Sequence, residues 1–191
     1  KDIDLIFKTA DSLFPFASRQ KITRVLQGAI LSNMFFEPST RTRISFGSAF
    51  NMLGGEVRET TEIEATSLAK GESLYDTSRV LSGYSDVIVM RHPLAGSVAE
   101  FAEASRVPVI NGGDGDNEHP SQALLDLFTI KKELESHNKE IDTARIALIG
   151  DLKFGRAAHS LCKILMLYAN ISIKLVSPDK LKVPDFLISE F

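Results

Sequence analysis

The sequence predicts an α/β protein in which a parallel sheet is flanked by helices. Short apolar runs alternate with stretches of helical periodicity along the chain, which is the pattern of βαβ units. Some of these runs, such as residues 28–36, are apolar almost throughout and are typical of strands buried on both faces. No internal repeat, low-complexity segment or long Pro/Gly linker interrupts the alternation. Sheets of this type bind ligands at the carboxyl ends of their strands.

The first expected element is a helix that Asp2 caps and Pro15 ends, because the apolar residues between them recur at helical spacing. A second helix, over residues 42–53, stops at the Gly54-Gly55 pair. Pro120 favours the start of a long helix over residues 120–134. The remaining expected elements of this part are strands at 28–36, near Val57, at 86–90 and at 107–110, helices near Leu74 and over 98–104, and a loop at 112–117.

The polar segment 135–143 predicts a domain boundary, because a fresh βαβ unit begins after it. That unit comprises a strand at 144–149, a helix at 156–168 and a strand at 171–176, followed by the start of a helix over 185–191. It is too small to be a whole domain. We therefore expect a complete first domain, residues 1–134, and the incomplete start of a second α/β domain, residues 135–191.

Composition excludes several classes of protein. A net charge of −3 and a pI of about 5.8 argue against a nucleic-acid partner. The single cysteine, Cys162, excludes an internal disulfide and fits a reducing compartment. No apolar run approaches the roughly 18 residues of a membrane span and no signal peptide is visible, so we expect a cytoplasmic protein without a membrane partner. No His or Cys pair has metal-ligand spacing, so we expect no metal.

The segment FEPSTRTRISF is the strongest candidate for chemistry. Pro38 follows an expected strand, and Ser39-Thr40-Arg41-Thr42 opens the next helix. The N–H groups of a helix N-terminus, three hydroxyls and a guanidinium group together make a suitable anion site. On this pattern alone, an ordinary Ser/Thr cap with solvent-facing arginines is equally consistent.

Further candidate residues lie at the ends of other expected strands. Arg91 ends the strand DVIVM, and His119 and Gln122 open the long helix. Taken singly, Arg91 also fits a solvated surface arginine and His119 a structural histidine. The segment GDLKFGR resembles a P-loop, but Arg156-Ala157 replace Lys-Ser/Thr, so we reject an ATP site and keep Arg156 as an anion ligand.

Ser67 and Lys70 lie in the polar segment EATSLAKGES. Its composition favours a solvated loop, but a loop with one lysine can also close over a phosphate. A calcium loop over the acidic residues from Asp114 is excluded, because Leu125 stands at the position of the bidentate Glu.

Five stretches, taken together and in order, resemble the catalytic chains of the aspartate carbamoyltransferase family, within the aspartate/ornithine carbamoyltransferase superfamily. The lysine of AKGES and the GDLKFGR segment are similar to the aspartate family, whereas the ornithine family usually has cysteine after His-Pro. The stretches, which cover most of residues 28–162, are FFEPSTRTRISF, TSLAKGESLYDT, VIVMRHP, PVINGGDGDNEHPSQALLDLFTI and GDLKFGRAAHSL.

The resemblance implies an enzyme of pyrimidine biosynthesis that transfers the carbamoyl group of carbamoyl phosphate to the amine of L-aspartate, without cofactor or metal. By similarity, the phosphate is held by Ser39, Thr40, Arg41 and Thr42. By similarity also, the carbamoyl oxygen is contacted by Thr42, Arg91 and His119, and the carbamoyl NH₂ by Gln122. Arg41, Thr42, Arg91 and His119 are thus the expected catalytic residues.

For the acceptor, the resemblance implies that Arg156 and Lys70 bind aspartate and that Glu37 pairs with Arg156 when the domains close. Ser67 and Lys70 resemble residues delivered by an adjacent subunit, which implies a homotrimer with shared active sites. The resemblance is also compatible with a regulatory or dihydroorotase-type partner subunit.

Two other functions stay open at this point. One is the same transfer to ornithine or a related amine. The other is a non-catalytic domain of the same fold that scaffolds a partner, although Arg41, Arg91 and His119 are all retained. The resemblance implies further sequence after Phe191, including a second aspartate-binding arginine. We therefore expect the 191-residue chain alone to bind the donor weakly or not at all and to turn over poorly.

Overall fold

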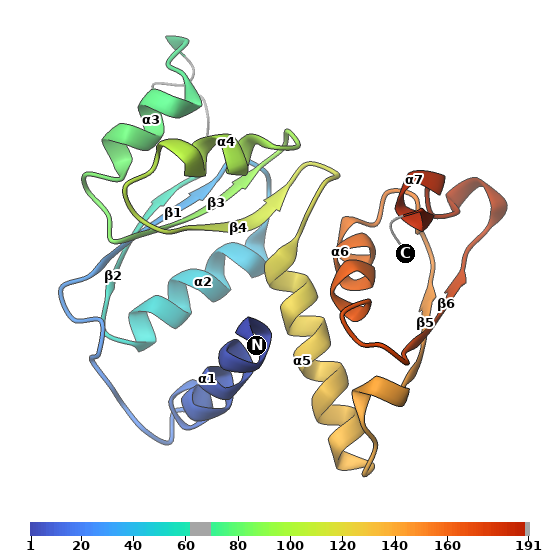
Figure 1. Ribbon diagram of the computed structural model, residues 1–191. Coiled ribbons are helices and arrows are strands. Elements are labelled where there is room, and N and C mark those ends of the chain that lie inside the picture. The colour runs from blue at the N-terminus through green and yellow to red at the C-terminus, as the bar shows by residue number, and fades with distance from the viewer. Residues whose placement is uncertain (62–69, 190–191) are drawn as a thin grey trace. The chain divides into compact units, whose positions relative to one another are not determined.

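The computed structural model describes residues 1–61 and 70–189, without the Phe186 side chain, and consists of two compact units. The first unit is Lys1–Gly115 and the second is Asp116–Phe191. Both are built of parallel strands and helices, which confirms the predicted α/β class (Figure 1). No described helix is both long and apolar enough to cross a membrane.

The first unit contains a four-stranded parallel sheet of order β2-β1-β3-β4. Helix α2 lies on one face of this sheet and α3 and α4 lie on the other (Figure 1). The elements are α1 (Asp2–Ala17), β1 (Ile30–Phe35), α2 (Thr40–Met52), β2 (Glu56–Thr60), α3 (Leu74–Leu81), β3 (Val87–His92), α4 (Ser97–Ala104) and β4 (Val109–Asp114).

The two central strands of this sheet, β1 and β3, are buried on both faces, which explains why most of their residues are apolar. Met34, Ile88 and Met90 pack with Phe101 of α4 on one face. On the opposite face, Leu31, Phe35 and Val89 pack with Phe46 and Phe50 of α2. Successive side chains of a strand alternate between faces, so an apolar core on each side requires an apolar residue at nearly every position.

The second unit pairs β5 with β6 as a two-stranded parallel sheet. Helix α5 packs against α6, with Leu127 and Leu165 fully buried. Its elements are α5 (Pro120–Ser136), η2 (Ile141–Thr143), β5 (Arg145–Ile149), α6 (Arg156–Leu165), β6 (Ser172–Val176), η3 (Asp179–Leu181) and α7 (Asp185–Ile188).

Two details of the first unit differ from the sequence predictions. Lys1, not Asp2, is the N-cap of α1, and the helix runs through Pro15 to Ala17. A proline so close to a helix end removes few hydrogen bonds, and the Ser18 N–H still reaches the Phe14 carbonyl. Strand β4 extends to Asp114, into the segment predicted as a loop, because it pairs with β3 as far as His92.

The compact units divide between Gly115 and Asp116. Helix α5 belongs to the second unit because it packs on α6, and the packing of a helix depends on its apolar face. The domain boundary expected from the polar segment 135–143 lies after α5 and stays a prediction.

Candidate active site

The start of α2 carries several kinds of hydrogen-bond donor. Its N-cap residue, Ser39, has an extended backbone, and its side chain makes no capping hydrogen bond. The Ser39 hydroxyl instead accepts a hydrogen bond from Arg91 Nη1 at 3.3 Å. Thr40 and Arg41 are exposed and Thr42 is partly buried. The first-turn N–H groups, the hydroxyls and the Arg41 guanidinium thus lie together at a helix N-terminus, an arrangement that favours an anion.

Arg91 lies beside this helix start because of the strand register. Phe35 of β1 is paired with Arg91 of β3, so the residues just after Phe35 meet the Arg91 side chain. Arg91 Nη2 contacts Glu37 Oε1 at 2.8 Å. Arg91 is only 9% exposed, yet its Nε has no hydrogen-bond partner. An unsatisfied buried donor costs about 1–3 kcal/mol, and an anion bound at this point would remove that cost.

A buried polar cluster ties α2 to the sheet. The Asn33 side chain is fully buried in β1, and its Nδ2 donates to the Arg43 carbonyl of α2 at 3.0 Å and to Glu59 Oε1 at 3.2 Å. Arg43 Nη1 contacts Glu59 Oε2 at 3.3 Å. Sequence reasoning missed this cluster, although an asparagine inside the apolar run ILSNMF was a signal of a buried hydrogen-bonding role.

The segment after Arg91 is held by His92 and Asp114. His92 Nδ1 accepts from the Leu94 N–H at 3.1 Å, and its ring makes an edge contact with Phe36. Asp114 accepts from the Gly96 N–H at 2.9 Å. Burial lowers the pKa of His92, and the carboxylates of Glu100 and Asp114 partly oppose this effect. A neutral imidazole is the form in which Nδ1 can accept a hydrogen bond.

In the second unit, His119 and Gln122 lie at the start of α5, as predicted. His119 is the N-cap residue, is 7% exposed and precedes Pro120 in the first turn. Its Nδ1 lies 3.4 Å from the Ser121 hydroxyl. Gln122 Nε2 donates to Asp126 Oδ1 at 2.8 Å, and this bond fixes the orientation of the amide.

Arg156 is the first residue of α6 and is partly buried. The turn before it is held by Asp151, whose Oδ1 accepts from the N–H groups of Lys153 and Phe154 at 3.0 Å each. His159 Nε2 contacts the Leu152 carbonyl at 2.8 Å across the same turn. Arg156 therefore lies at the carboxyl end of β5, the edge at which parallel sheets bind ligands.

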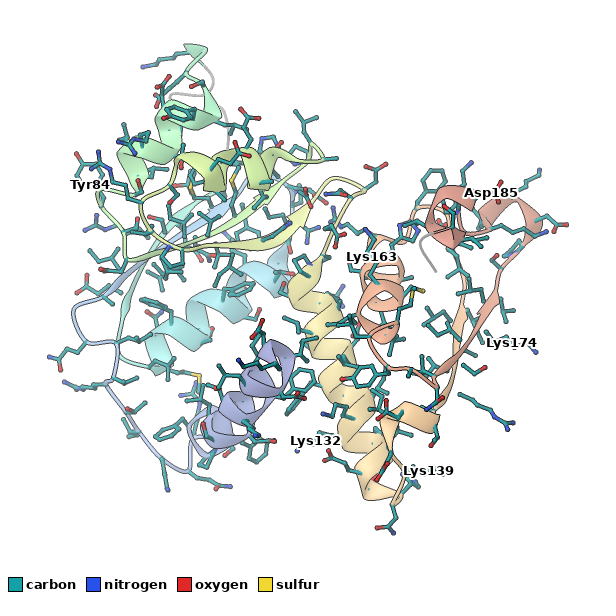
Figure 2. All side chains as sticks on the ribbon, in the orientation of Figure 1. Tyr84, Lys132, Lys139, Lys163, Lys174 and Asp185 are labelled. Atoms are coloured by element: carbon teal, nitrogen blue, oxygen red, sulfur yellow. The ribbon has the colours of Figure 1, made fainter. Side chains whose placement is uncertain are left out.

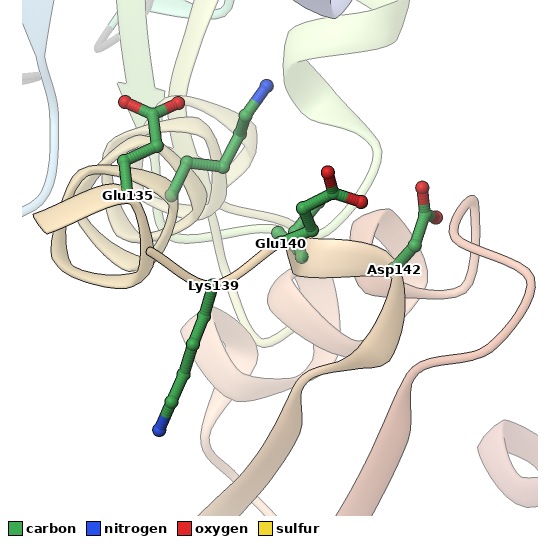
Figure 3. A pocket seen from close by; sticks show the side chains of 6 residues that line it. Glu135, Lys139, Glu140 and Asp142 are labelled. Carbon is green, nitrogen blue, oxygen red and sulfur yellow. The ribbon is translucent and has the colours of Figure 1, made fainter. Parts of the chain in front are cut away.

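A surface pocket of about 230 Å³ lies at the other end of α5 and is not part of this site. It is lined by Glu135, Glu140 and Asp142, together with Lys131, Lys139 and Ile141. Figure 3 shows the Lys139 side chain extending away from these carboxylates. The first lining residue on α5, Lys131, is 12 residues after His119. At a rise of about 1.5 Å per residue, the pocket is roughly three helical turns from His119.

The predicted residues thus form a group in each unit. In the first unit, Arg91 contacts both Glu37 and Ser39, beside Thr40, Arg41 and Thr42. His119, Gln122 and Arg156 lie at helix starts in the second unit. Lys70 is exposed, and Ser67 lies outside the described residues.

Comparison with known proteins extends over nearly the whole chain. The profile of a family described as "Aspartate/ornithine carbamoyltransferase, carbamoyl-P binding domain" matches residues 1–132. The aspartate carbamoyltransferase catalytic subunit of Cellvibrio japonicus is 69% identical over 190 residues, covering 100% of this chain and 56% of that protein. The protein of the same name from Saccharophagus degradans is 70% identical over 184 residues, covering 96% of this chain and 55% of its own length.

The solved structures that this chain resembles are of enzymes with a similar name. The catalytic subunit of M. jannaschii aspartate transcarbamoylase has a TM-score of 0.89 at 46% identity, covering 99% of this chain and 60% of that one. The Trypanosoma cruzi aspartate transcarbamoylase in complex with N-(phosphonacetyl)-L-aspartic acid has a TM-score of 0.89 at 42% identity, with the same two coverages. The chain spans a little over half the length of the curated relatives that it matches. On the family profile, which covers more than half of its residues, the chain belongs to the aspartate/ornithine carbamoyltransferase family.

Proposed function

We propose that this chain is the carbamoyl phosphate-binding part, together with the opening of the aspartate-binding part, of an aspartate carbamoyltransferase catalytic chain. The observation that carries the proposal is the buried Arg91 side chain, whose Nε lacks an acceptor directly beside the Ser39–Thr42 helix start. The names of its relatives support aspartate as the acceptor. The Trypanosoma cruzi enzyme has been solved with carbamoyl aspartate and phosphate.

In this proposal the first unit holds the donor. The phosphate group binds the N–H groups at the start of α2, the hydroxyls of Ser39, Thr40 and Thr42, and the Arg41 guanidinium. The carbonyl oxygen of the carbamoyl group faces Thr42, Arg91 and, from α5, His119. Gln122 accepts from the carbamoyl NH₂ with its amide oxygen, since its amide nitrogen donates to Asp126.

The chemistry needs positioning and charge stabilisation rather than a covalent intermediate. The aspartate amine attacks the carbamoyl carbon, and the electron pair of the C=O bond moves onto the oxygen. Donors from Arg91, His119 and Thr42 stabilise this developing oxyanion. The pair then returns, the bond from carbon to the phosphate oxygen breaks, and phosphate leaves with the bonding electrons and takes up the proton that the attacking amine loses. Loss of one such donor typically costs about 10²–10³ in rate.

For the acceptor, Arg156 binds a carboxylate of aspartate, and Glu37 pairs with Arg156 when the two domains close. Ser67 and Lys70 are supplied by an adjacent subunit, so the working assembly is a homotrimer with shared active sites. The exposure of Lys70 is compatible with a role in a neighbouring subunit's site. The expected compartment is the cytoplasm.

The experiment is calorimetric binding of phosphonoacetamide, a stable carbamoyl phosphate analogue, to the complete product of the gene. Arg41→Ala is expected to abolish measurable binding. Arg43→Ala is the matched control, because it removes the same charge from the same helix but its guanidinium is engaged with Glu59 on β2. An equal loss of analogue affinity in both variants would contradict a phosphate site at Arg41.

Turnover distinguishes the acceptors. The complete gene product is expected to form carbamoyl aspartate from carbamoyl phosphate and aspartate, and to show no comparable rate with ornithine. Analogue binding without turnover of either amine would instead favour the scaffold function.

A further inference from the structure

The Gln122 side chain is held by a carboxylate of its own helix. Gln122 Nε2 donates a hydrogen bond to Asp126 Oδ1 at 2.8 Å. The two residues are four positions apart on α5, so their side chains are neighbours on one face of the helix. Both are partly buried. Asp126 is therefore a fixed partner for one end of the Gln122 amide.

This contact decides which end of the Gln122 amide is left for another partner. A glutamine amide has two donors on its nitrogen and two acceptor lone pairs on its oxygen, whereas an ionised carboxylate can only accept. If the amide were turned over, its oxygen would face Asp126, and the two groups in contact would both be acceptors. The carboxylate thus selects the orientation in which Nε2 lies on Asp126 and Oε1 remains for a donor.

The surroundings of the pair limit its freedom to rearrange. Gln122 directly precedes Ala123, which is 2% exposed, and Asp126 directly precedes Leu127, which is fully buried. Both members therefore lie beside the packed face of α5. Gln–Asp pairs at this spacing also occur as simple support for a helix. This one lies in the first two turns of α5, directly after the buried His119.

The carbamoyl group requires the orientation that Asp126 selects. The NH₂ of a carbamoyl group donates hydrogen bonds, and in the proposed function it donates to Gln122 Oε1. An acetyl group has nearly the same shape but carries a methyl group in place of the NH₂. It would leave Oε1 without a donor, and a site built to hydrogen-bond one substrate group rejects an analogue that lacks this group. The orientation of the amide therefore determines which acyl group the site prefers.

We propose that Asp126 is a positioning residue that fixes the Gln122 amide and so makes the site select a carbamoyl group over an acetyl group. This inference rests on the proposed function, because it takes Gln122 to contact the carbamoyl NH₂. Asp126 itself touches no substrate. It acts by keeping the amide oxygen, rather than the amide nitrogen, directed to the donor.

The test compares two phosphonates that differ in a single group. Phosphonoacetamide carries an NH₂, and acetonylphosphonate carries a methyl group in its place. Calorimetry on the complete gene product measures the affinity for each. The parent protein should prefer phosphonoacetamide by about 10-fold or more, and Asp126→Ala should reduce this preference by about 3–10-fold. A merely structural role of Asp126 would weaken the binding of both ligands equally and leave the ratio of affinities unchanged.

Asp126→Asn is the sharper variant, because it preserves the shape of the side chain. An asparagine amide can pair with Gln122 in either orientation, so the preference for phosphonoacetamide should fall although the packing is retained. The ratio is the readout because the change of charge acts on both phosphonates alike. If Asp126→Ala fails to fold, Asp126→Asn gives the same comparison.

A double variant exchanges the roles of the two side chains. Gln122→Glu alone sets two carboxylates against each other, so we expect it to lose the preference for phosphonoacetamide. Gln122→Glu combined with Asp126→Asn restores one donor and one acceptor, with the acceptor-only group at position 122. The double variant should therefore recover part of the preference that Gln122→Glu loses. A double variant no more selective than Gln122→Glu would contradict the proposed pairing.

Glu135→Gln is the matched control for Asp126→Asn. It neutralises a carboxylate on the same helix, where Glu135 Oε2 lies 3.5 Å from Nζ of Lys132, which Figure 2 labels. This variant should keep the parental ratio of affinities. An equal fall of the ratio in Glu135→Gln and Asp126→Asn would mean that the charge of α5, and not the contact with Gln122, sets the preference.

Gln122→Ala separates this inference from the proposed function. If Gln122→Ala lowers the preference for phosphonoacetamide while the Asp126 variants keep the parental ratio, the role of Asp126 is overturned and the proposed function stands. If the parent protein binds neither phosphonate, or if Gln122→Ala keeps the parental ratio, the proposed contact of Gln122 with the carbamoyl NH₂ fails, and the role of Asp126 fails with it.

Discussion

Arg91 Nη2 and Glu37 Oε1 lie 2.8 Å apart at the carboxyl edge of the first sheet, where β1 and β3 run side by side. The Glu37 carboxylate is therefore paired with the Arg91 guanidinium, which faces the carbamoyl group in the proposed function. A negative side chain at this distance also repels an incoming phosphate. We therefore expect substitutions of Glu37 and of Arg91 to change anion affinity in opposite directions.

Glu37→Gln is expected to tighten binding of phosphonoacetamide by about 3–10-fold, since removing the charge stabilises the bound anion by about 1 kcal/mol. Arg91→Lys should weaken binding by about 10-fold or more, because a lysine cannot present the fork of donors that an arginine does. Calorimetry on both variants checks the signs. Weaker binding in Glu37→Gln would mean that the carboxylate orders Arg91 rather than competing with the ligand.

Asn33→Asp is expected to destabilise the chain by about 2–4 kcal/mol at neutral pH, because it adds an unpaired buried charge beside Glu59. Burial and the Glu59 carboxylate raise the pKa of the introduced carboxyl above its unfolded value. The lost stability should therefore be recovered as the pH falls and the group becomes protonated. Urea denaturation of parent and variant at several pH values measures this, and a penalty independent of pH would contradict the explanation.

The lowered pKa of His92 predicts that the chain loses stability as the pH falls below about 6.5. The unfolded state then binds a proton that the folded state resists, so unfolding is favoured by at most about 1.4 kcal/mol per pH unit. Above the unfolded pKa this contribution is fully present. His92→Asn is the control, since its amide oxygen can accept from the Leu94 N–H without titrating. The stability difference between parent and variant should narrow between pH 7 and pH 5.5.

Gly47→Ala is expected to stabilise the chain by up to about 1 kcal/mol, since alanine is the better helix former. A Cβ at Gly47 in α2 would meet its nearest neighbours at 3.6–3.7 Å, which is ordinary contact. Gly55→Ala should destabilise it, because the new Cβ would lie 2.2 Å from Phe50 Cε1 and 3.2 Å from the Ala29 carbonyl oxygen. Thermal unfolding of the two variants should move in opposite directions.

The central strands of the first sheet could be predicted from the sequence because they carry apolar residues on both faces. A short, mostly apolar run such as residues 30–36, bounded by Gly28 and Pro38, is typical of a strand buried on both faces. The ends of elements were less predictable. Strand β4 continues through Gly112 and Gly113 because β3 lies beside it, and no property of the glycines themselves indicates that pairing.

The candidate site could be predicted where it depends on strand ends and helix starts. Ser39–Thr42 and Arg91 were identified this way, and the register of β1 and β3 brings Ser39 and Arg91 into contact. The contact that α6 makes just before the start of α5 was not predicted. Ser160 and Glu118 are separated by more than 40 residues, and their hydrogen bond depends on how α6 packs against α5. Such packing is not encoded in any local pattern.

The strand order of the first sheet has a consequence for how the chain folds. Strand β1 is central, and both of its partners come later in the sequence, with Leu31 paired to Val57 and to Val87. The β1–β3 pairing closes a long loop, which is a slow step in folding. Ser39 and Arg91 meet only when that pairing is complete. An anion that needs both residues therefore binds no earlier intermediate, so its uptake during refolding would report the moment at which the sheet closes.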